Sequence, residues 1–406
     1  MLPRFPVLRH RNFRLYVLGQ GLSLVGFWMQ SVAQSWLVYR LSGSAFALGV
    51  VAFASYAPVL GVAPIAGVAA DRVRRYHLVI LTQVLLMLIA LALGAVVATG
   101  HATVPIIVAA AAATGIVSAF DIPARQSFLV EMVGAEDLPG AIALNASIFN
   151  GARMVGPAVA GLLVAEVGEG PCFLLNAASY VAVLVALARM RLERPRAAPT
   201  ATFTTGFLGG VQYVRRQPVL QTLLLLLGVV GSLGFPWSIL LPVFAGEVFG
   251  VGPRGYGLLL AAAGIGAVLS GLRLASRRYS RLEHRRNLLI GLTSLGCGVV
   301  GLALSRTVLV AMAAQALAGF GMIRYAATTN TILQLVVEDR YRGRVMGLYT
   351  VMFLGTAPLG SLLLGAVAER FGAPLAALLS GSVSLAAGAW LALRLRDVAR
   401  REQAAA

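Results

Sequence analysis

Charge and cysteine are scarce in this chain. Only 12% of its 406 residues are charged, whereas soluble domains hold about a quarter, and 59% are hydrophobic. The mean hydropathy is +0.84. Two cysteines, Cys172 and Cys297, and four scattered histidines provide neither a disulfide framework nor metal-ligand spacing. The composition therefore excludes a disulfide scaffold, predicts no metal site and indicates a polytopic membrane protein.

Lysine is absent. All 33 basic residues are arginine, and with 15 acidic residues the formal net charge is +18. Such a charge is compatible with nucleic-acid binding, but the cytoplasmic loops of membrane proteins collect arginine in the same way, and we expect no nucleic acid partner. The sequence also lacks a Gly-Lys-Ser/Thr phosphate loop and any His/Asp/Glu cluster. We therefore expect neither an enzyme nor an ATP-driven pump, and no cofactor.

Long apolar runs fill the chain, and a helical membrane span needs about 20 residues of this kind. The loops on one side of the runs contain only a few arginines, and the other side collects many more, so the positive-inside rule predicts both termini in the cytoplasm. The first run has no small-residue cleavage site and is predicted to be an uncleaved span. We count twelve spans, near 15–38, 46–69, 77–98, 104–125, 140–164, 171–189, 218–245, 255–275, 286–304, 308–331, 345–368 and 372–394. The few arginines of the predicted outer loops are Arg40, Arg254, Arg306 and Arg370.

The chain contains an internal repeat. Ala124–Gly168 aligns with Thr328–Gly372 without a gap when the sequence is shifted by 204 positions. Four glycines stay in register, namely Gly151, Gly156, Gly161 and Gly168 on Gly355, Gly360, Gly365 and Gly372. A repeat in a membrane chain points to a transporter built from two halves around a midplane site.

The repeat and the composition divide the chain into three parts. We predict an all-α fold with two pseudo-symmetric bundles of six helices, at 1–190 and 218–406. The segment 191–217 is predicted to be a cytoplasmic linker whose second part, Phe203 to Val214, forms an interfacial amphipathic helix. Each half also contains a charged loop, at 131–137 and at 338–344, and we expect the eleventh helix to begin near Arg344 or Val345.

The loop after the second span reads Gly67-Val-Ala-Ala-Asp71-Arg72-Val-Arg74-Arg75. It resembles the Gly-x-x-x-Asp-Arg signature of the major facilitator superfamily, although Arg74 stands where glycine is usual. The resemblance implies a cytoplasmic gate, with Asp71 meeting the start of the eleventh helix. A basic inner loop that merely obeys the topology rule is the alternative. The gate residues that we infer are Gly67, Asp71, Arg72, Arg75, Asp121 and Arg344.

The fifth span resembles the glycine- and proline-containing motif of the exporting branches of that superfamily, with Ala160 in place of one glycine. Small residues let helices pack closely, and a proline bends a helix, so ordinary packing is the alternative interpretation. The residues of this candidate export motif are Gly151, Arg153, Gly156, Pro157 and Gly161.

Three further segments, Trp28–Tyr39, Phe120–Gln126 and Arg342–Tyr349, are similar to the bacterial branch that includes the enterobactin exporter and related drug and macrolide efflux proteins. The resemblance covers nearly the whole chain. It implies a monomeric inner-membrane antiporter that exports an amphipathic small molecule, such as a drug or siderophore, by alternating access, usually coupled to proton influx. A facilitator, a flippase for lipid-like molecules and a non-transporting receptor or scaffold remain open.

Several polar and aromatic residues interrupt the spans. Burying charge in lipid costs at least about 2.5 kcal/mol, so Arg153 and Arg324 should face the protein interior or a water-filled cavity, as contacts to cargo or as structural ion pairs. No acid lies mid-membrane. Asp121, with Arg75 or Arg125 as a partner, is an inner-gate residue or the proton carrier, and the sequence leaves both open. The candidate cavity residues are Gln30, Gln34, Asn145, Arg153, Arg324, Asn330, Phe235 and Trp237, of which the amides have interhelical hydrogen bonding as the alternative role and the tryptophan interface anchoring.

Overall fold

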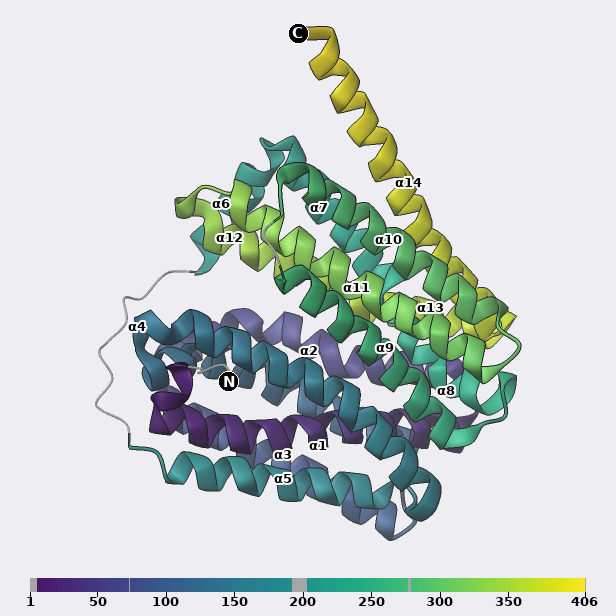
Figure 1. The fold of residues 1–406 in the computed structure, drawn as a ribbon. Coiled ribbons are helices and arrows are strands. Elements are labelled where there is room, and N and C mark those ends of the chain that lie inside the picture. The colour runs from purple at the N-terminus through teal and green to yellow at the C-terminus, as the bar shows by residue number, and fades with distance from the viewer. Residues whose placement is uncertain (1–5, 73, 192–202, 277–278, 406) are drawn as a thin grey trace. The chain divides into compact units, whose positions relative to one another are not determined.

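The computed structural model describes residues 6–72, 74–191, 203–276 and 279–405, and within these ranges the side chains at 63–72, 135, 203–208, 281, 354 and 395–405 are not described. The described chain is helical almost throughout (Figure 1). Its first half contains a short 3-10 turn, Pro6–Arg9, followed by α1 (Arg11–Ser42), α2 (Ala45–Arg72), α3 (Arg75–Ala98), α4 (Val104–Val167) and α5 (Gly170–Ala188).

The second half begins with α6 (Phe203–Arg215) and is less regular. α7 (Pro218–Val229) continues through a π-helical turn, Val230–Gly234, into the 3-10 turn Pro236–Leu240, because Pro236 lacks the N–H that an α-helix requires. Then follow α8 (Leu241–Val243), the π-helical turn Phe244–Val248, α9 (Gly252–Ala275), α10 (Arg281–Leu304), α11 (Val308–Val336), α12 (Asp339–Thr350), the π-helical turn Val351–Gly355, α13 (Ala357–Phe371) and α14 (Ala373–Ala405).

Eleven helical stretches of the described chain are long and apolar enough to cross a membrane. They correspond to eleven of the twelve expected spans. The other expected span, 15–38, lies in α1, which has 32 residues but contains Gln20, Gln30 and Gln34 and is therefore less apolar. The total of twelve spans stays a prediction.

The described chain forms two compact units, and each takes a short segment from the other half of the sequence. Unit 1 comprises 1–43, 54–201 and 252–261, and unit 2 comprises 44–53, 202–251 and 262–406. Unit 2 thus includes the first residues of α2, and unit 1 includes the first residues of α9. The domain boundaries at 190 and 218 stay a prediction.

Within unit 1, α1 packs against α4 and α5, and α3 packs against the same two helices (Figure 1). Near the start of α1, Phe13 and Phe128 are fully buried and lie in a core that also contains Tyr16 and Leu187. In unit 2, α10 packs along α11 and α14. Apolar helix faces therefore hold each unit together.

The two expected charged loops differ in the structure. The first, at 131–137, contains the break between the two helices that make up α4, at Gly134, whose φ of 76° is a left-handed conformation that favours glycine. The second, at 338–344, is mostly helix, because α12 begins at Asp339. The expectation that this helix begins near Arg344 or Val345 was wrong. An acid in the first turn stabilises a helix N-terminus, which favours the earlier start.

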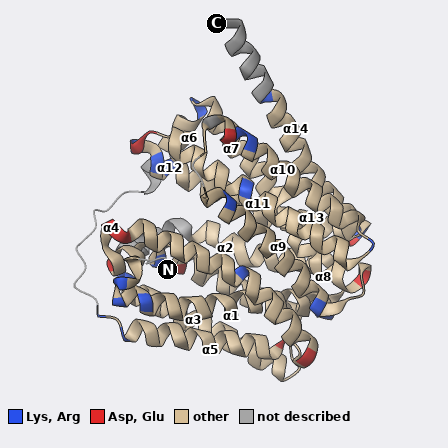
Figure 2. Cartoon of the chain, viewed as in Figure 1, with Lys and Arg blue, Asp and Glu red and all other residues tan. Residues whose placement is uncertain are grey.

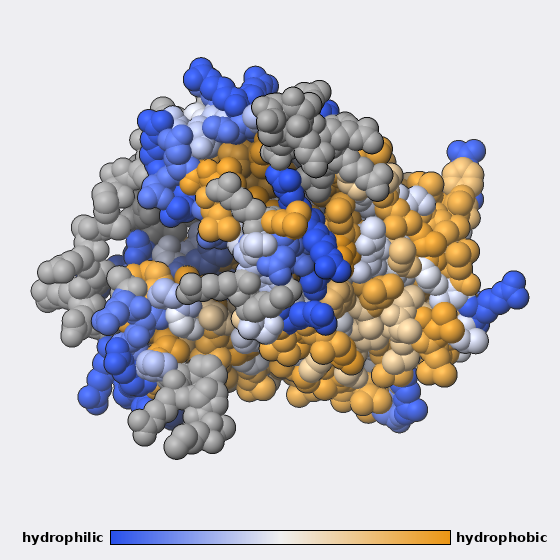
Figure 3. Space-filling view, turned by 45° about the horizontal axis from the view of Figure 1, so that its top comes forward, coloured by the Kyte–Doolittle hydropathy of each residue, from blue (hydrophilic) through white to orange (hydrophobic). Residues whose placement is uncertain are grey.

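Charged residues lie mostly toward the ends of helices (Figure 2). Apolar side chains dominate much of the face shown in Figure 3, and the hydrophilic ones gather in separate patches. Many large apolar side chains are more than half exposed, among them Leu18, Leu162 and Leu309. Such exposure is expected of helices that face lipid.

Candidate functional site

The repeated glycines bring the backbone of a repeat helix against the first helix of the same half. A Cβ atom added to Gly156 of α4 would lie 2.6 Å from the Cβ of Trp28 and 3.0 Å from the carbonyl oxygen of Val25, both in α1. One added to Gly360 of α13 would overlap the carbonyl of Ser232 in the π-helical turn after α7. Glycine is required at both positions because any side chain would push the helices apart.

The next glycines of the repeat contact the second helix of the other half. In unit 1, a Cβ on Gly161 would lie 2.9 Å from the Cα of Gly257 in α9. In unit 2, a Cβ on Gly365 would lie 2.8 Å from the carbonyl oxygen of Ala45 in α2. The contact is made from both sides, because a Cβ on Gly257 would approach the carbonyl of Pro157.

A glutamate follows each of these glycine contacts. Glu166 of α4 forms an ion pair with Arg254 in the first turn of α9. Glu369 of α13 accepts hydrogen bonds from the hydroxyl of Ser44 at 3.0 Å and from the backbone N–H of Phe46 at 3.2 Å. A carboxylate near the first N–H groups of α2 interacts favourably with the helix dipole. Both copies of the repeat therefore end on a polar contact to a helix N-terminus.

An aromatic pair also recurs in each half. In unit 1, Trp28 and Phe149 meet edge to face with ring centroids 5.6 Å apart, and in unit 2 Phe235 and Phe353 do so at 5.5 Å. Phe149 and Phe353 are equivalent positions of the repeat. In unit 1 a cation adjoins the pair, because the guanidinium of Arg153 lies over the Trp28 ring, 5.6 Å from its centroid.

Asp121 is buried within unit 1, with 1% of its surface exposed. Its Oδ1 accepts hydrogen bonds from the hydroxyl of Thr82 at 2.8 Å and from the amide of Gln83 at 2.9 Å, both in α3. Its other oxygen pairs with Arg125 one turn along α4. Of its two expected partners, Arg125 is therefore the one that it contacts. All three contacts lie inside one unit.

Of the remaining expected gate residues, the structure describes the side chains of Arg75 and Arg344. The side chains of Gly67, Asp71 and Arg72 lie outside the described residues. Arg75 pairs with Glu131 of α4 at 3.0 Å, inside unit 1. The gate assignment of these residues stays a prediction.

Arg344 faces the linker helix α6. Its guanidinium lies 5.6 Å from the ring centroid of Tyr341, which in turn stacks on Tyr213 of α6 at 4.2 Å. A Cβ on Gly210 would lie 3.0 Å from the Cβ of Arg344. The contacts of this arginine therefore attach the linker helix to α12.

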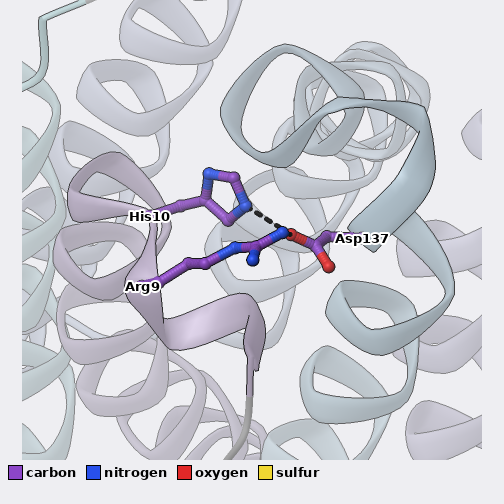
Figure 4. Close-up of polar contacts among 3 residues, drawn as sticks. All are labelled: Arg9, His10 and Asp137. Carbon is purple, nitrogen blue, oxygen red and sulfur yellow. Dashed lines mark hydrogen bonds and ion pairs between the residues drawn. The ribbon is translucent and has the colours of Figure 1, made fainter.

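The bend at Gly134 is held from the N-terminal segment (Figure 4). Arg9 donates to Oδ2 of Asp137 at 2.8 Å, and Nε2 of His10 lies 2.6 Å from the same oxygen. Together with the Arg75–Glu131 pair, these contacts fix both sides of the bend. These pairs could not be predicted from local sequence patterns, because the partners are more than 50 residues apart.

The expected cavity residues divide into two groups. Gln30 accepts a hydrogen bond from Asn176 of α5 at 2.6 Å, Trp237 donates to Gln315 of α11 at 3.0 Å, and Arg324 donates to Asn287 of α10 at 2.7 Å. Each of these three side chains is buried, and each of the three hydrogen bonds joins residues of the same unit. The partly exposed group comprises Gln34, Asn145, Arg153, Phe235 and Asn330.

Among the described residues, no group of three His, Cys, Asp or Glu side chains is placed to hold a metal ion.

The apolar helices, the two-fold repeat and the buried charge pair define a polytopic membrane transporter of the major facilitator superfamily. Residues 3–406 match the transmembrane secretion effector family, and the chain belongs to this family. Because the family is one of transporters, the chain is not an enzyme.

Characterised relatives cover most of the chain. It is 28% identical over 365 residues to the multidrug efflux pump Tap of Mycolicibacterium fortuitum, which covers 87% of each chain. It is also 28% identical to the staphyloferrin A transporter of Staphylococcus aureus, over 86% of this chain and 88% of the relative. The sequence-based assignment to a branch of drug and siderophore exporters is thereby confirmed.

Solved structures support the fold. A peptide transporter POT superposes with a TM-score of 0.76 at 12% identity, covering 96% of this chain and 95% of the other. A bacterial homolog of the human lysosomal transporter Spinster gives 0.74 at 15% identity, covering 95% and 96%. At these identities the likeness concerns the fold alone.

Proposed function

We propose that the chain exports an amphipathic small molecule across the bacterial plasma membrane by alternating access, with proton influx as the driving force. Both termini lie in the cytoplasm in this proposal, and the working form is a monomer. The glycine contacts of the repeat are the observation that supports it best.

Alternating access needs contacts that separate and re-form without repacking a core. Gly161 and Gly365 each place a repeat helix against the second helix of the other half, backbone against backbone. Few side chains interdigitate at such a contact, so it can open without leaving large cavities. The contacts occur twice, at equivalent positions, as two symmetric halves of a transporter require.

The glutamates beyond these glycines complete a closing device on the predicted outer side. The side chains of Glu166 and Arg254 are more than half exposed, so their ion pair contributes only about 0–1 kcal/mol. The dipole interaction of Glu369 with the N-terminus of α2 is worth about 0.3–1 kcal/mol when exposed. Contacts of this strength hold a state closed yet break within a transport cycle.

The names of the relatives support export of drugs or siderophores, since one is a multidrug efflux pump and another a staphyloferrin A transporter. The coupling ion has less support. Asp121 is the most deeply buried acid among the described side chains, but both of its carboxylate oxygens already contact Arg125 or two hydrogen-bond donors of α3. We therefore assign Asp121 a structural role in unit 1 and leave the proton-carrying group to experiment.

Everted membrane vesicles that contain the full chain test this proposal. A panel of amphipathic probes of negative, neutral and positive charge is offered on the outside, with and without an acid-inside pH gradient. We expect at least one probe to accumulate, faster with the gradient, and each such probe to release protons from the vesicle lumen.

Vesicles made with the vector alone provide the control for passive leakage. Accumulation that ignores the pH gradient would contradict proton coupling and favour a facilitator. A chain that moves none of the probes, and shows no probe-dependent proton flux, would instead favour a receptor or scaffold.

A further inference from the structure

The interior of unit 1 contains a cation beside aromatic rings, where α1 and α4 meet. Phe149, Arg153 and Gly156 follow one another at spacings of four and three residues, so they share one face of α4. This face meets Trp28 of α1. Gly156 allows the close approach, and one turn before it the longer side chain of Arg153 extends over the indole ring.

Trp28 also provides a hydrogen-bond donor to this place. Its Nε1 is buried and has no hydrogen-bond partner among the described residues. A buried N–H without an acceptor destabilises the fold, so such a group is usually retained for a ligand or a water molecule. The guanidinium of Arg153 supplies further donors and a full positive charge.

Neither of the two helix segments that meet here supplies a carboxylate. The helix α1 has no acidic residue, and neither does α4 between Leu138 and Ala165. Phe27 adds a second ring, whose centroid lies 5.6 Å from that of Trp28. The rings of Trp28 and Phe149 present both edge and face. Phe149 keeps 40% of its surface exposed and Arg153 is partly exposed, so the cluster is open on one side.

We propose that this cluster binds the anionic group of an aromatic organic acid, with Arg153 and the Trp28 N–H as donors to its carboxylate and Phe149 against its ring. A carboxylate accepts two N–H groups at once, and charge-assisted hydrogen bonds of this kind are roughly twice as strong as neutral ones. Aromatic walls favour a flat, apolar partner for the rest of the ligand. The inference rests on the proposed function and narrows its cargo to anions.

The chain contains a matched control. Arg394 lies over the ring of Trp390, 5.3 Å from its centroid, near the end of α14. This second arginine–tryptophan pair has similar geometry, but it lies in unit 2, and both side chains are well exposed. Substitutions there change the same residue types without touching the cluster at Trp28.

The test measures equilibrium binding to the purified full chain, with radiolabelled naphthoate as the anionic probe and naphthamide as its neutral counterpart. The unchanged protein should bind naphthoate about tenfold or more tightly than naphthamide, the difference expected of one charge-assisted pair. Arg153→Gln should remove this preference, and Arg153→Lys should restore part of it. Trp28→Phe keeps a ring but removes the N–H, and should weaken naphthoate binding a few-fold. Arg394→Gln and Trp390→Phe should leave both probes unaffected.

Equal binding of the two probes by the unchanged protein, or no binding of naphthoate, would overturn the proposal. Unaltered preference in a folded Arg153→Gln variant would do the same. If that variant does not fold, the comparison of Arg153→Lys and Trp28→Phe with the unchanged protein tests the proposal, because these substitutions retain a long cationic side chain and an aromatic ring in the packing. If the vesicle assay shows export of neutral or cationic probes only, the proposed anion site is contradicted but the proposed export function is not. If the vesicles transport none of the probes, the export function is contradicted, whereas the binding assay still tests the anion site.

Discussion

Gly49 and Gly257 occupy the same structural position in two different helices. A Cβ on Gly49 would lie 2.6 Å from the carbonyl oxygen of Ser361, and one on Gly257 would lie 2.6 Å from the carbonyl oxygen of Pro157. Ser361 and Pro157 are themselves equivalent, 204 positions apart. The helices that contact the repeat, α2 and α9, are therefore also structurally equivalent. This equivalence is not part of the gapless alignment of Ala124–Gly168 with Thr328–Gly372, because both helices lie outside the aligned segments.

These contacts predict which glycines tolerate a methyl group. Gly161→Ala and Gly360→Ala should lower the free energy of unfolding by about 1–3 kcal/mol, because overpacking forces the backbones apart. A Cβ on Gly151, in the same helix as Gly161, would meet nothing within 4 Å. Gly151→Ala should therefore be neutral or stabilise by up to about 1 kcal/mol through helix propensity. Thermal unfolding in detergent compares the three, and equal effects would refute the packing argument.

Asp121 should be structural. Asp121→Asn leaves Arg125 without its carboxylate partner, and breaking a buried pair costs roughly 3–5 kcal/mol. We expect the low end, because the Arg125 side chain is 23% exposed, and we expect the double substitution with Arg125→Leu to recover most of the loss. Unfolding measurements decide this point. If Asp121→Asn instead keeps its stability and substrate exchange but loses pH-driven transport, Asp121 is the proton carrier.

Arg344 should hold the linker helix in place. Arg344→Ala removes the side chain that packs across Gly210 and over the Tyr341 ring. We expect faster proteolysis at the linker, with the melting temperature of the protein little changed. Arg342→Ala, two positions earlier in α12, removes only an exposed pair with Asp339 and serves as the control. Limited proteolysis in detergent measures both, and identical cleavage rates would show that α6 does not depend on Arg344.

Glu369 should contribute modestly to outer closure. Glu369→Gln keeps the shape but removes the charge that meets the N-terminus of α2. A loss of about 0.3–1 kcal/mol shifts a two-state equilibrium by roughly two- to five-fold toward the open state. Reaction of a cysteine at Ser361 with a membrane-impermeant thiol reagent should accelerate by that factor. No change in the rate would mean that this carboxylate does not hold the contact.

Sequence patterns located the spans and the repeat, because apolar length and glycine register are properties of the chain itself. Pairings between distant residues were harder. Arg75 was one of two expected partners of Asp121, yet it pairs with Glu131, and nothing in helical periodicity selects among several nearby acids. The buried bonds of Trp237 to Gln315 and of Arg324 to Asn287 likewise depend on how two helices rotate against each other.

The sequence contains a signal for the start of α12 at Asp339, but we placed this start near Arg344 or Val345. Glu338 and Asp339 are suitable for a helix N-terminus, and three arginines with Gly343 gave the same stretch the composition of a loop. The acid in the first turn carried the stronger signal. The grouping of the first residues of α2 and α9 with the other unit likewise depends on contacts between distant helices.

The central claim is that the paired glycine contacts open and close during transport. Glu166→Cys and Arg254→Cys, in a chain whose Cys172 and Cys297 are replaced by alanine, place two thiols beside the Gly161–Gly257 contact. A short, reducible bifunctional thiol reagent then links α4 to α9, and probe accumulation in everted vesicles is measured before linking, after linking and after reduction. The account predicts that linking stops transport and that reduction restores it. Full transport by the linked protein would contradict it.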